Sequence, residues 1–314
     1  CANRSCKARI STPKSTGNLV GQSIPLHQLL REGQGLPCGF ALLPNKEQST
    51  YEMILNDLRN KVAPDDTKPT TIVTDFERSV INAIGLVFPE TAHTGCQFHF
   101  RAAIWNQIKD KGLQSFFCQN AKFQEILYKM YALSYVPVEQ VIRFYEEQIL
   151  TCVENNLDEE VGDEEWLEVS RELEVFGDYF TRTWIGNKST TRSGNQNRRR
   201  PLFAIKSWNQ WSTVSADGTA TNNSLECFNR VWNSQVGPHP NVWKVIDAFI
   251  KTEAESRRIL LSNAIGQDLH QNTGRKEITM ANHQRLKLLA EQFGVLPDKE
   301  YLQQVAHELQ KSDN

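Results

Sequence analysis

Two segments far apart in the sequence each place a carboxylate where metal-dependent chemistry could use it. Asp75 follows the β-branched run Thr70–Thr74 and precedes a helical pattern, so we expect it where a strand ends and a helix begins. Glu226 lies near the start of a predicted helix, in the polar segment Thr221–Glu226. If the two acids meet in space, their hard oxygen atoms predict a Mg²⁺ or Mn²⁺ site for phosphoryl chemistry.

Each acid also has a purely structural interpretation. Asp75 could cap the following helix by accepting a hydrogen bond from a backbone N–H. Glu226 could be solvated on a helix surface, or be stabilised by the helix dipole without any metal. The sequence leaves these alternatives open for both acids.

The segments around Asp75 predict an α/β sheet covered by helices. Residues 36–111 show the patterns of a strand and a helix in alternation, repeated three times. Residues 121–180 have helical periodicity without a strand signal, which predicts an all-helical insertion. The polar segment 186–197 predicts a mobile loop, and helices are predicted again from about residue 225 to residue 309.

Composition excludes several classes of protein. The chain has 314 residues and 39% hydrophobic content, enough for a substantial core in one large domain or two ordinary ones. No apolar run approaches the roughly 20 residues of a membrane helix, and there is no secretory h-region, so we expect an intracellular protein without a membrane partner. The seven scattered cysteines argue against a disulfide framework. Because the chain begins with Cys1 rather than Met, we expect a fragment or an incomplete gene model.

Charge is strongly segregated although the net charge is only −2. Residues 154–174 carry ten acids, whereas residues 179–216 carry seven Lys or Arg and no acid. Within that basic stretch, Arg198, Arg199 and Arg200 could contact the phosphates of a nucleic acid, and Trp208 could stack on its bases. The alternative is an ordinary solvated loop beside core aromatic side chains.

Four longer segments occur in an order that carries a family resemblance. They are FALLPNKEQSTYEMILNDL (Phe40–Leu58), TIVTDFERSVINAIGLVFP (Thr71–Pro89), GCQFHFRAAIWNQIKDKGL (Gly95–Leu113) and TNNSLECFNRVWNSQV (Thr221–Val236). Together they resemble the transposase domain of Mutator-like elements (MULEs), over roughly residues 33–260. The resemblance implies an RNase H-like, integrase-type fold with an Asp, Asp, Glu triad, which uses Mg²⁺ or Mn²⁺ for DNA strand cleavage and transfer.

The resemblance also assigns roles to individual residues. It implies that Asp75 is the second Asp and Glu226 the Glu of the triad, and both would be metal ligands. Cys96 and His99 match the Cys-x-x-His motif of the family. These two residues could be half of a zinc site, or a buried thiol and an imidazole that pack beside the catalytic strand. Residues 114–210 would be the helical insertion that the family places before the Glu.

The first acid of the triad has no counterpart in the sequence. No Asp precedes Asp57, and the earlier acids Glu32, Glu47 and Glu52 lie outside a strand-like setting. We therefore predict an RNase H-like core that lacks its first strand, with an all-helical insertion and a helical C-terminus. Without the carboxylate that bridges two metal ions, the protein is predicted to be catalytically inactive as it stands.

The first residues carry a second, shorter resemblance. The residues that resemble the end of a FLYWCH-type zinc finger are Cys1, Cys6, Lys7, Ala8, Arg9, Ile10 and Thr12. Such a finger needs two thiolates and two imidazoles around Zn²⁺, but only the two thiolates and the single His27 are present. We therefore expect a truncated finger remnant with Cys1 and Cys6 as its zinc ligands.

These observations predict a domain order and two competing functions. The predicted ranges are a finger remnant (1–24), the first part of the core (25–113), the insertion (114–210), the end of the core (211–260) and C-terminal helices (261–314). The first function is that of a MULE-type transposase or its degenerate relative. The second is that of a non-catalytic DNA-binding protein derived from one. Both imply DNA as the partner and the nucleus as the location, and both leave homo-oligomerisation open.

Overall fold

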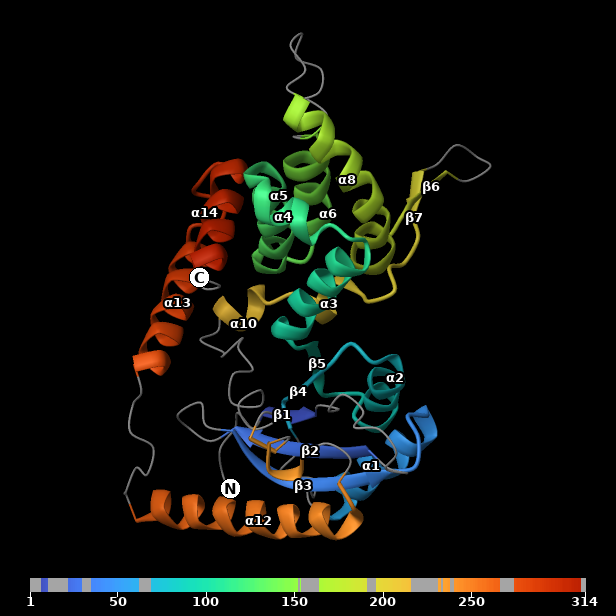
Figure 1. Ribbon diagram of the computed structural model, residues 1–314, viewed down its shortest axis with the longest axis vertical. Helices are drawn as coiled ribbons and strands as arrows, with labels where there is room; N and C mark the ends of the chain where they lie inside the picture. The colour runs from blue at the N-terminus through green and yellow to red at the C-terminus, as the bar shows by residue number, and fades with distance from the viewer. Residues whose placement is uncertain are drawn as a thin grey trace. The chain divides into compact units, whose positions relative to one another are not determined.

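The computed structural model divides the chain into two compact units. It describes residues 7–10, 22–29, 35–61, 69–151, 153, 164–190, 196–215, 231–232, 234–237, 240–265 and 274–311. The first unit comprises Cys1–Cys96 and Thr221–Asn272, and the second comprises Gln97–Ala220 and Thr273–Asn314 (Figure 1). Each unit is thus built from two separate parts of the sequence.

A five-stranded mixed sheet forms the centre of the first unit. Its spatial order is β3 (Gly35–Leu43), β2 (Gln22–Leu29), β1 (Lys7–Ile10), β4 (Thr71–Thr74) and β5 (Ala92–Gly95). Strand β2 pairs antiparallel with both β3 and β1, whereas β1, β4 and β5 run parallel. A helix follows each of β3, β4 and β5 in the sequence, as the alternating pattern of residues 36–111 predicted.

The prediction that the sheet lacks a central first strand is wrong. Strand β1 lies between β2 and β4, and Arg9 pairs with His27 on one side and with Val73 on the other. The residues of β1 are those that resemble the end of a zinc finger. Because β2 and β4 would otherwise each have an unpaired backbone edge at the middle of the sheet, even a four-residue strand satisfies many backbone groups.

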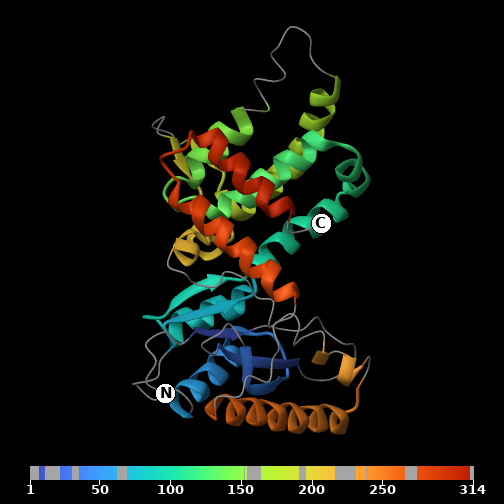
Figure 2. The ribbon, with the colours of Figure 1, turned by 90° about the vertical axis from the view of Figure 1, so that its left-hand side faces the viewer.

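Helices cover both faces of this sheet. Helices α1 (Gln48–Lys61) and α2 (Arg78–Val87) pack in one core with Leu43, while Phe40, on the same strand, packs with α12 (Val242–Ala264) in another. Side chains an odd number of positions apart on a strand point to opposite faces, which explains why Phe40 and Leu43 belong to different cores. Figures 1 and 2 show α12 running alongside β3.

An aromatic cluster holds the C-terminal part of the first unit to the sheet. The ring of Phe40 lies 5.2 Å from that of Trp232 and 4.6 Å from that of Phe249, centroid to centroid. Trp232 and Phe249 also stack on each other at 5.1 Å. The chain therefore returns to the sheet after the long excursion through the second unit.

The second unit is mainly helical. Its C-terminal helix α14 (Asp298–Lys311) packs on α5 (Ala121–Ala132), and the Tyr301 hydroxyl donates a hydrogen bond to the carbonyl oxygen of Tyr135 at 2.6 Å. The other helical elements are α3 (Gln97–Asp110), α4 (Gln114–Gln119), η2 (Leu133–Tyr135), α6 (Val141–Phe144), η3 (Tyr145–Leu150), α8 (Glu164–Phe180), η4 (Thr181–Ile185), α9 (Ile205–Trp208), α10 (Trp211–Ser215) and α13 (Gly274–Glu291).

The boundaries of the two units differ from the predicted ranges. Helix α3 lies in the second unit, so the division falls after Cys96 rather than after residue 113. The buried side chains of α3 explain this placement: Phe100 stacks on Trp208 with ring centroids 4.9 Å apart. The C-terminal helices belong to the same unit, through contacts such as that of Tyr301.

The insertion is not all-helical, contrary to the prediction. Strands β6 (Lys188–Thr190) and β7 (Gln196–Arg198) pair antiparallel in the segment predicted as a loop. Each strand has only three residues and no apolar alternation, so sequence periodicity had nothing to detect. No helix in the described part of the chain is long and apolar enough to cross a membrane.

Candidate functional site

Asp75 lies at the carboxyl end of the parallel strands. It directly follows β4, whose last residue Thr74 pairs with Ile10 of β1 and with Gly95 of β5. Helix α2 begins three residues later, which confirms the predicted order of strand, acid and helix. This edge is where sheets with parallel strands place functional groups.

Asp75 is not the N-cap residue of α2. That position belongs to Glu77, whose side chain makes no capping hydrogen bond. The structural alternative for Asp75, helix capping, therefore does not describe the start of this helix.

The backbone before Asp75 is held by contacts with the neighbouring strand. The Thr74 side chain is buried, and its hydroxyl lies 2.9 Å from the carbonyl oxygen of Asp75 and 2.8 Å from Nε2 of His93 on β5. The backbone N–H of Cys96 donates to the carbonyl oxygen of Thr74 at 2.8 Å. These bonds fix the position from which the Asp75 side chain leaves the sheet.

Glu77 lies two positions after Asp75 and provides a second carboxylate, which is hydrogen-bonded to a residue of α1. The hydroxyl of the buried Tyr51 donates to Oε1 of Glu77 at 2.7 Å, and Nζ of Lys46 lies 3.5 Å from Oε2. Burial raises the pKa of Tyr51, and the hydrogen bond to Glu77 and the negative charges of Glu77 and Asp75 raise this pKa further. Tyr51 therefore stays a neutral donor, and both carboxylates act on the same phenol.

Replacing Tyr51 by Phe should lower the free energy of unfolding by about 1–3 kcal/mol, because it removes a donor from a half-buried carboxylate. Urea denaturation of the Tyr51→Phe, Glu77→Gln and double variants would measure this loss and the coupling between the two residues. Additive effects of the two substitutions would contradict the direct interaction.

The acids in the described part of the first unit do not form a metal centre. Strand β1 contributes Lys7, Ala8, Arg9 and Ile10 to the position beside β4, and none of these carries a carboxylate. Within the described ranges, no group of three or more His, Cys, Asp or Glu side chains could hold a metal ion. Glu226 lies outside the described residues, so its distance from Asp75 stays a prediction to be tested.

The cysteine motifs fall in different places. Cys96 follows β5 and is a buried free thiol, and His99 lies half-buried in the first turn of α3. No group of three or more potential metal ligands among the described residues includes this pair, and both interpretations of the pair stay open. Cys1 and Cys6 lie outside the described residues.

Trp208 cannot stack on nucleic-acid bases, contrary to the prediction. Its side chain is fully buried, parallel to the ring of Phe100 at 4.9 Å and edge-on to that of Trp184 at 6.4 Å. Its indole N–H donates to the carbonyl oxygen of Trp184 at 3.2 Å. The ring faces and the polar atom are therefore all used inside the helical unit.

The three consecutive arginines have different surroundings. The guanidinium of Arg198 binds the carboxylate of Glu146 and the carbonyl oxygen of Gly186, whereas Arg199 and Arg200 are exposed. Arg199 and Arg200 therefore stay candidates for contact with an anion. The guanidinium of Arg198 is instead used in contacts within the second unit.

Sequence reasoning missed two residues that organise these sites. Tyr51 shows no local signal of its contact with Glu77, since a tyrosine at a helical position normally indicates core packing. Glu146 is 52 positions from Arg198 and lies in a helical segment where acids are common on the surface. For Tyr51, the one signal in the sequence was a second acid, Glu77, close to Asp75, since such an acid requires a hydrogen-bond donor if it is buried.

Comparison with known families supports part of the resemblance. Residues 17–103 match the family model described as the MULE transposase domain. The matched segment contains β2, β3, β4 and β5, and with them Asp75, Cys96 and His99, and it ends before Glu226. No curated protein matches the chain.

Proposed function

We propose that this chain is a transposase-derived protein with an RNase H-like core, which binds DNA but does not cut it. The family match supports transposase descent of the first unit. The mixed sheet with Asp75 at the carboxyl end of β4, next to the parallel strand β1, supports an RNase H-like core.

One observation carries the proposed inactivity. The strand beside β4, where the resemblance calls for the first Asp of the triad, is built from Lys7–Ile10 and has no acid. Two-metal catalysis needs ligands that hold both ions close together, and a strand without Asp or Glu supplies no carboxylate for this purpose. Loss of a bridging carboxylate removes several kcal/mol of transition-state stabilisation, a rate loss of roughly a thousandfold or more.

The residues present do not fit the two Mg²⁺ or Mn²⁺ ions of the family. Asp75 supplies hard oxygen donors, and Glu226 would have to supply the others. Since the first acid of the triad is missing, the two remaining acids do not provide the ligands for two metal ions. Zinc binding by Cys1 and Cys6 stays a separate prediction.

Strand cleavage tests the proposed inactivity. The chain, incubated with a labelled DNA duplex and Mg²⁺ or Mn²⁺, should give the same background as the Asp75→Ala and Glu226→Ala variants. Cleavage by the parent chain that both substitutions abolish would overturn the proposal, because it would show that the two acids suffice for catalysis.

The exposed cations of the second unit favour retained DNA binding. Arg199 and Arg200 are exposed within a stretch, residues 179–216, that has no acid. Guanidinium groups are suited to phosphate contacts, and such contacts do not depend on catalysis. We therefore propose, as a second function, that the chain is a regulatory DNA-binding protein of the nucleus that derives from a transposase. Binding of a DNA duplex at low ionic strength, measured by fluorescence anisotropy, tests it.

A further inference from the structure

The basic hairpin of the second unit, defined as β6, β7 and the following Arg199 and Arg200, is an element that the predictions did not contain. In Figure 1 its two paired strands extend beyond the helices of this unit. Its described residues include Lys188 and three consecutive arginines, and no acid occurs in the sequence between residues 179 and 216. The hairpin therefore presents positive charge on a narrow, two-stranded support.

The base of the hairpin has a defined backbone geometry. Gly186 has φ +96°, and a Cβ atom at this position would lie 2.1 Å from the carbonyl oxygen of Arg199. The N–H of Arg199 donates to the carbonyl oxygen of Asn187 at 2.9 Å. Only glycine allows both the positive φ and this close approach of the two chain segments.

Ion pairs with one acid anchor the strands to the helical body. Glu146, on the π-helical turn η3, binds the guanidinium of Arg198, and Nζ of Lys188 lies 3.2 Å from its Oε1. The side chain of Arg198 is only 18% exposed and also binds the carbonyl oxygen of Gly186. Arg198 is therefore a positioning residue, which sets the direction of the ribbon from its base.

Other cations remain exposed around this anchored base. Arg199 and Arg200 follow β7, Arg182 lies on η4, and Lys206 lies on α9. The N–H of Leu202 donates to the carbonyl oxygen of Arg182 at 3.2 Å, which keeps these segments together.

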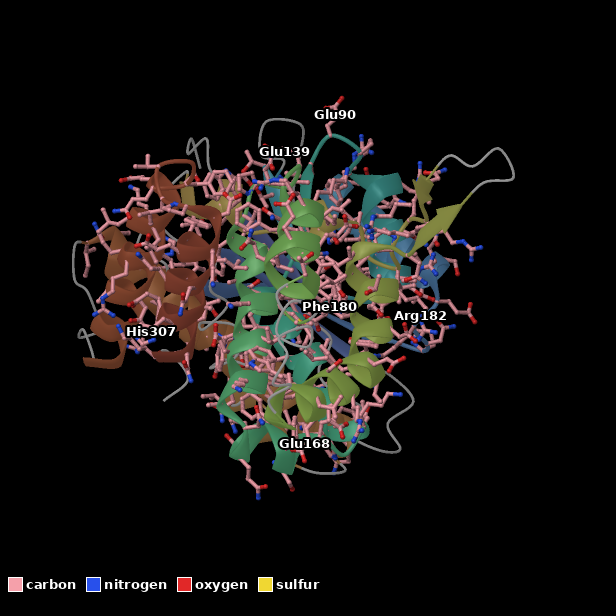
Figure 3. All side chains as sticks on the ribbon, turned by 90° about the horizontal axis from the view of Figure 1, so that it is seen from above. Glu90, Glu139, Glu168, Phe180, Arg182 and His307 are labelled. Atoms are coloured by element: carbon pink, nitrogen blue, oxygen red, sulfur yellow. The ribbon has the colours of Figure 1, made fainter. Side chains whose placement is uncertain are left out.

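Figure 3 shows the contrast on η4 and the end of α8: Phe180 lies among the helices, whereas Arg182 lies at the surface. No carboxylate of the described residues pairs with Arg182, Arg199, Arg200 or Lys206.

Three aromatic rings described near the base of the hairpin pack within the helical unit. Proteins that bind single strands usually combine a basic groove with exposed aromatic rings. Here the indoles of Trp184 and Trp208 are buried, and Phe203 packs against Trp184 with ring centroids 5.1 Å apart. A two-stranded ribbon, by contrast, fits the major groove of B-DNA, and arginines at its base can reach the flanking phosphates.

We infer that the basic hairpin is a duplex-DNA binding element, in which Arg199 and Arg200 contact phosphates and Gly186, Arg198 and Glu146 hold the ribbon in place. This inference rests on the proposed DNA-binding function and names its partner as double-stranded rather than single-stranded DNA.

Salt-dependent binding of the full chain tests the role of the arginines. The parent and the Arg199→Ala/Arg200→Ala variant would be titrated with a random-sequence duplex of about 30 base pairs at several salt concentrations. If both arginines contact phosphates, the variant should bind roughly 10- to 100-fold more weakly near 0.1 M salt. The slope of log K against log salt should fall by roughly 1.8.

A matched control separates a specific site from general positive charge. Arg257→Ala/Arg258→Ala removes two exposed arginines from α12, where each pairs with a glutamate of the same helix. This variant has the same change in net charge and should bind the duplex within about twofold of the parent.

A backbone variant tests the positioning of the ribbon without removing any cation. Gly186→Ala should weaken duplex binding about as much as the double arginine variant, because it displaces the base of the hairpin. Far-UV circular dichroism of Gly186→Ala would show whether the helical unit is intact. If the unit is unfolded, the binding of Arg199→Ala/Arg200→Ala decides whether the hairpin is the site.

The outcomes distinguish this inference from the proposed function. A parent chain that binds no duplex at low salt would refute DNA binding itself. Duplex binding that is unchanged in Arg199→Ala/Arg200→Ala would refute the hairpin as its site and leave DNA binding in place. Tighter binding of a single strand than of the duplex would refute the choice of partner.

Discussion

Replacing Trp208 by Ala is expected to lower the free energy of unfolding of the second unit by about 3–5 kcal/mol. The indole fills space between Phe100 and Trp184, with ring centroids 4.9 and 6.4 Å away, so its removal leaves a cavity and also removes a hydrogen bond to the carbonyl oxygen of Trp184. Urea denaturation followed by far-UV circular dichroism, with hydrogen exchange to locate the effect, would measure the loss.

The size of this loss decides between two roles for Trp208. A tryptophan that stacked on DNA from an exposed position would change stability by less than about 0.5 kcal/mol and would weaken DNA binding directly. Leu202→Ala, at a site that is 48% exposed in the same segment, is the matched control and should have little effect. A Trp208→Ala variant as stable as this control would contradict the burial.

Replacing Trp232 by Ala is expected to lower the stability of the first unit by a similar amount, about 3–5 kcal/mol. Trp232 is buried and stacks on Phe40 of β3 and on Phe249 of α12. Since these rings join the sheet to the segment that follows the second unit, hydrogen exchange should also become faster in β3.

Trp243 provides the control for this prediction. It lies on α12, only a few positions from the aromatic cluster, and is 74% exposed. Trp243→Ala should therefore change the stability by less than about 0.5 kcal/mol. Equal effects of the two tryptophan substitutions would mean that Trp232 does not connect α12 to the sheet.

The elements around Asp75 could be predicted because their patterns are local. The strand before Asp75 and the helix after it are confirmed, with Val80, Ile84 and Val87 buried on one helix face. A run of β-branched residues predicts a strand, and a helical repeat predicts a helix, from the residues of that segment alone. The helical nature of the described residues between 121 and 180 was predicted for the same reason.

Strand β1 and the basic hairpin could not be predicted, because short strands depend on their neighbours. Four residues of β1 become a strand through backbone bonds to β2 and to β4, whose residue Val73 pairs with Arg9. The three-residue strands of the hairpin depend in addition on an acid in another helix, Glu146. Neither dependence leaves a pattern in the local sequence.

The sequence by itself determined the chemistry that is available: Asp75 after a strand, a family resemblance around it, no earlier Asp, and a basic stretch without acids. Only the tertiary structure decided how these residues are used. It placed a strand without a carboxylate beside β4, buried Trp208, tied Arg198 to Glu146 and left Arg199 and Arg200 exposed. The physical reason is that residue types and spacing follow from the chain alone, whereas burial, strand pairing and ion pairing depend on segments far away in the sequence.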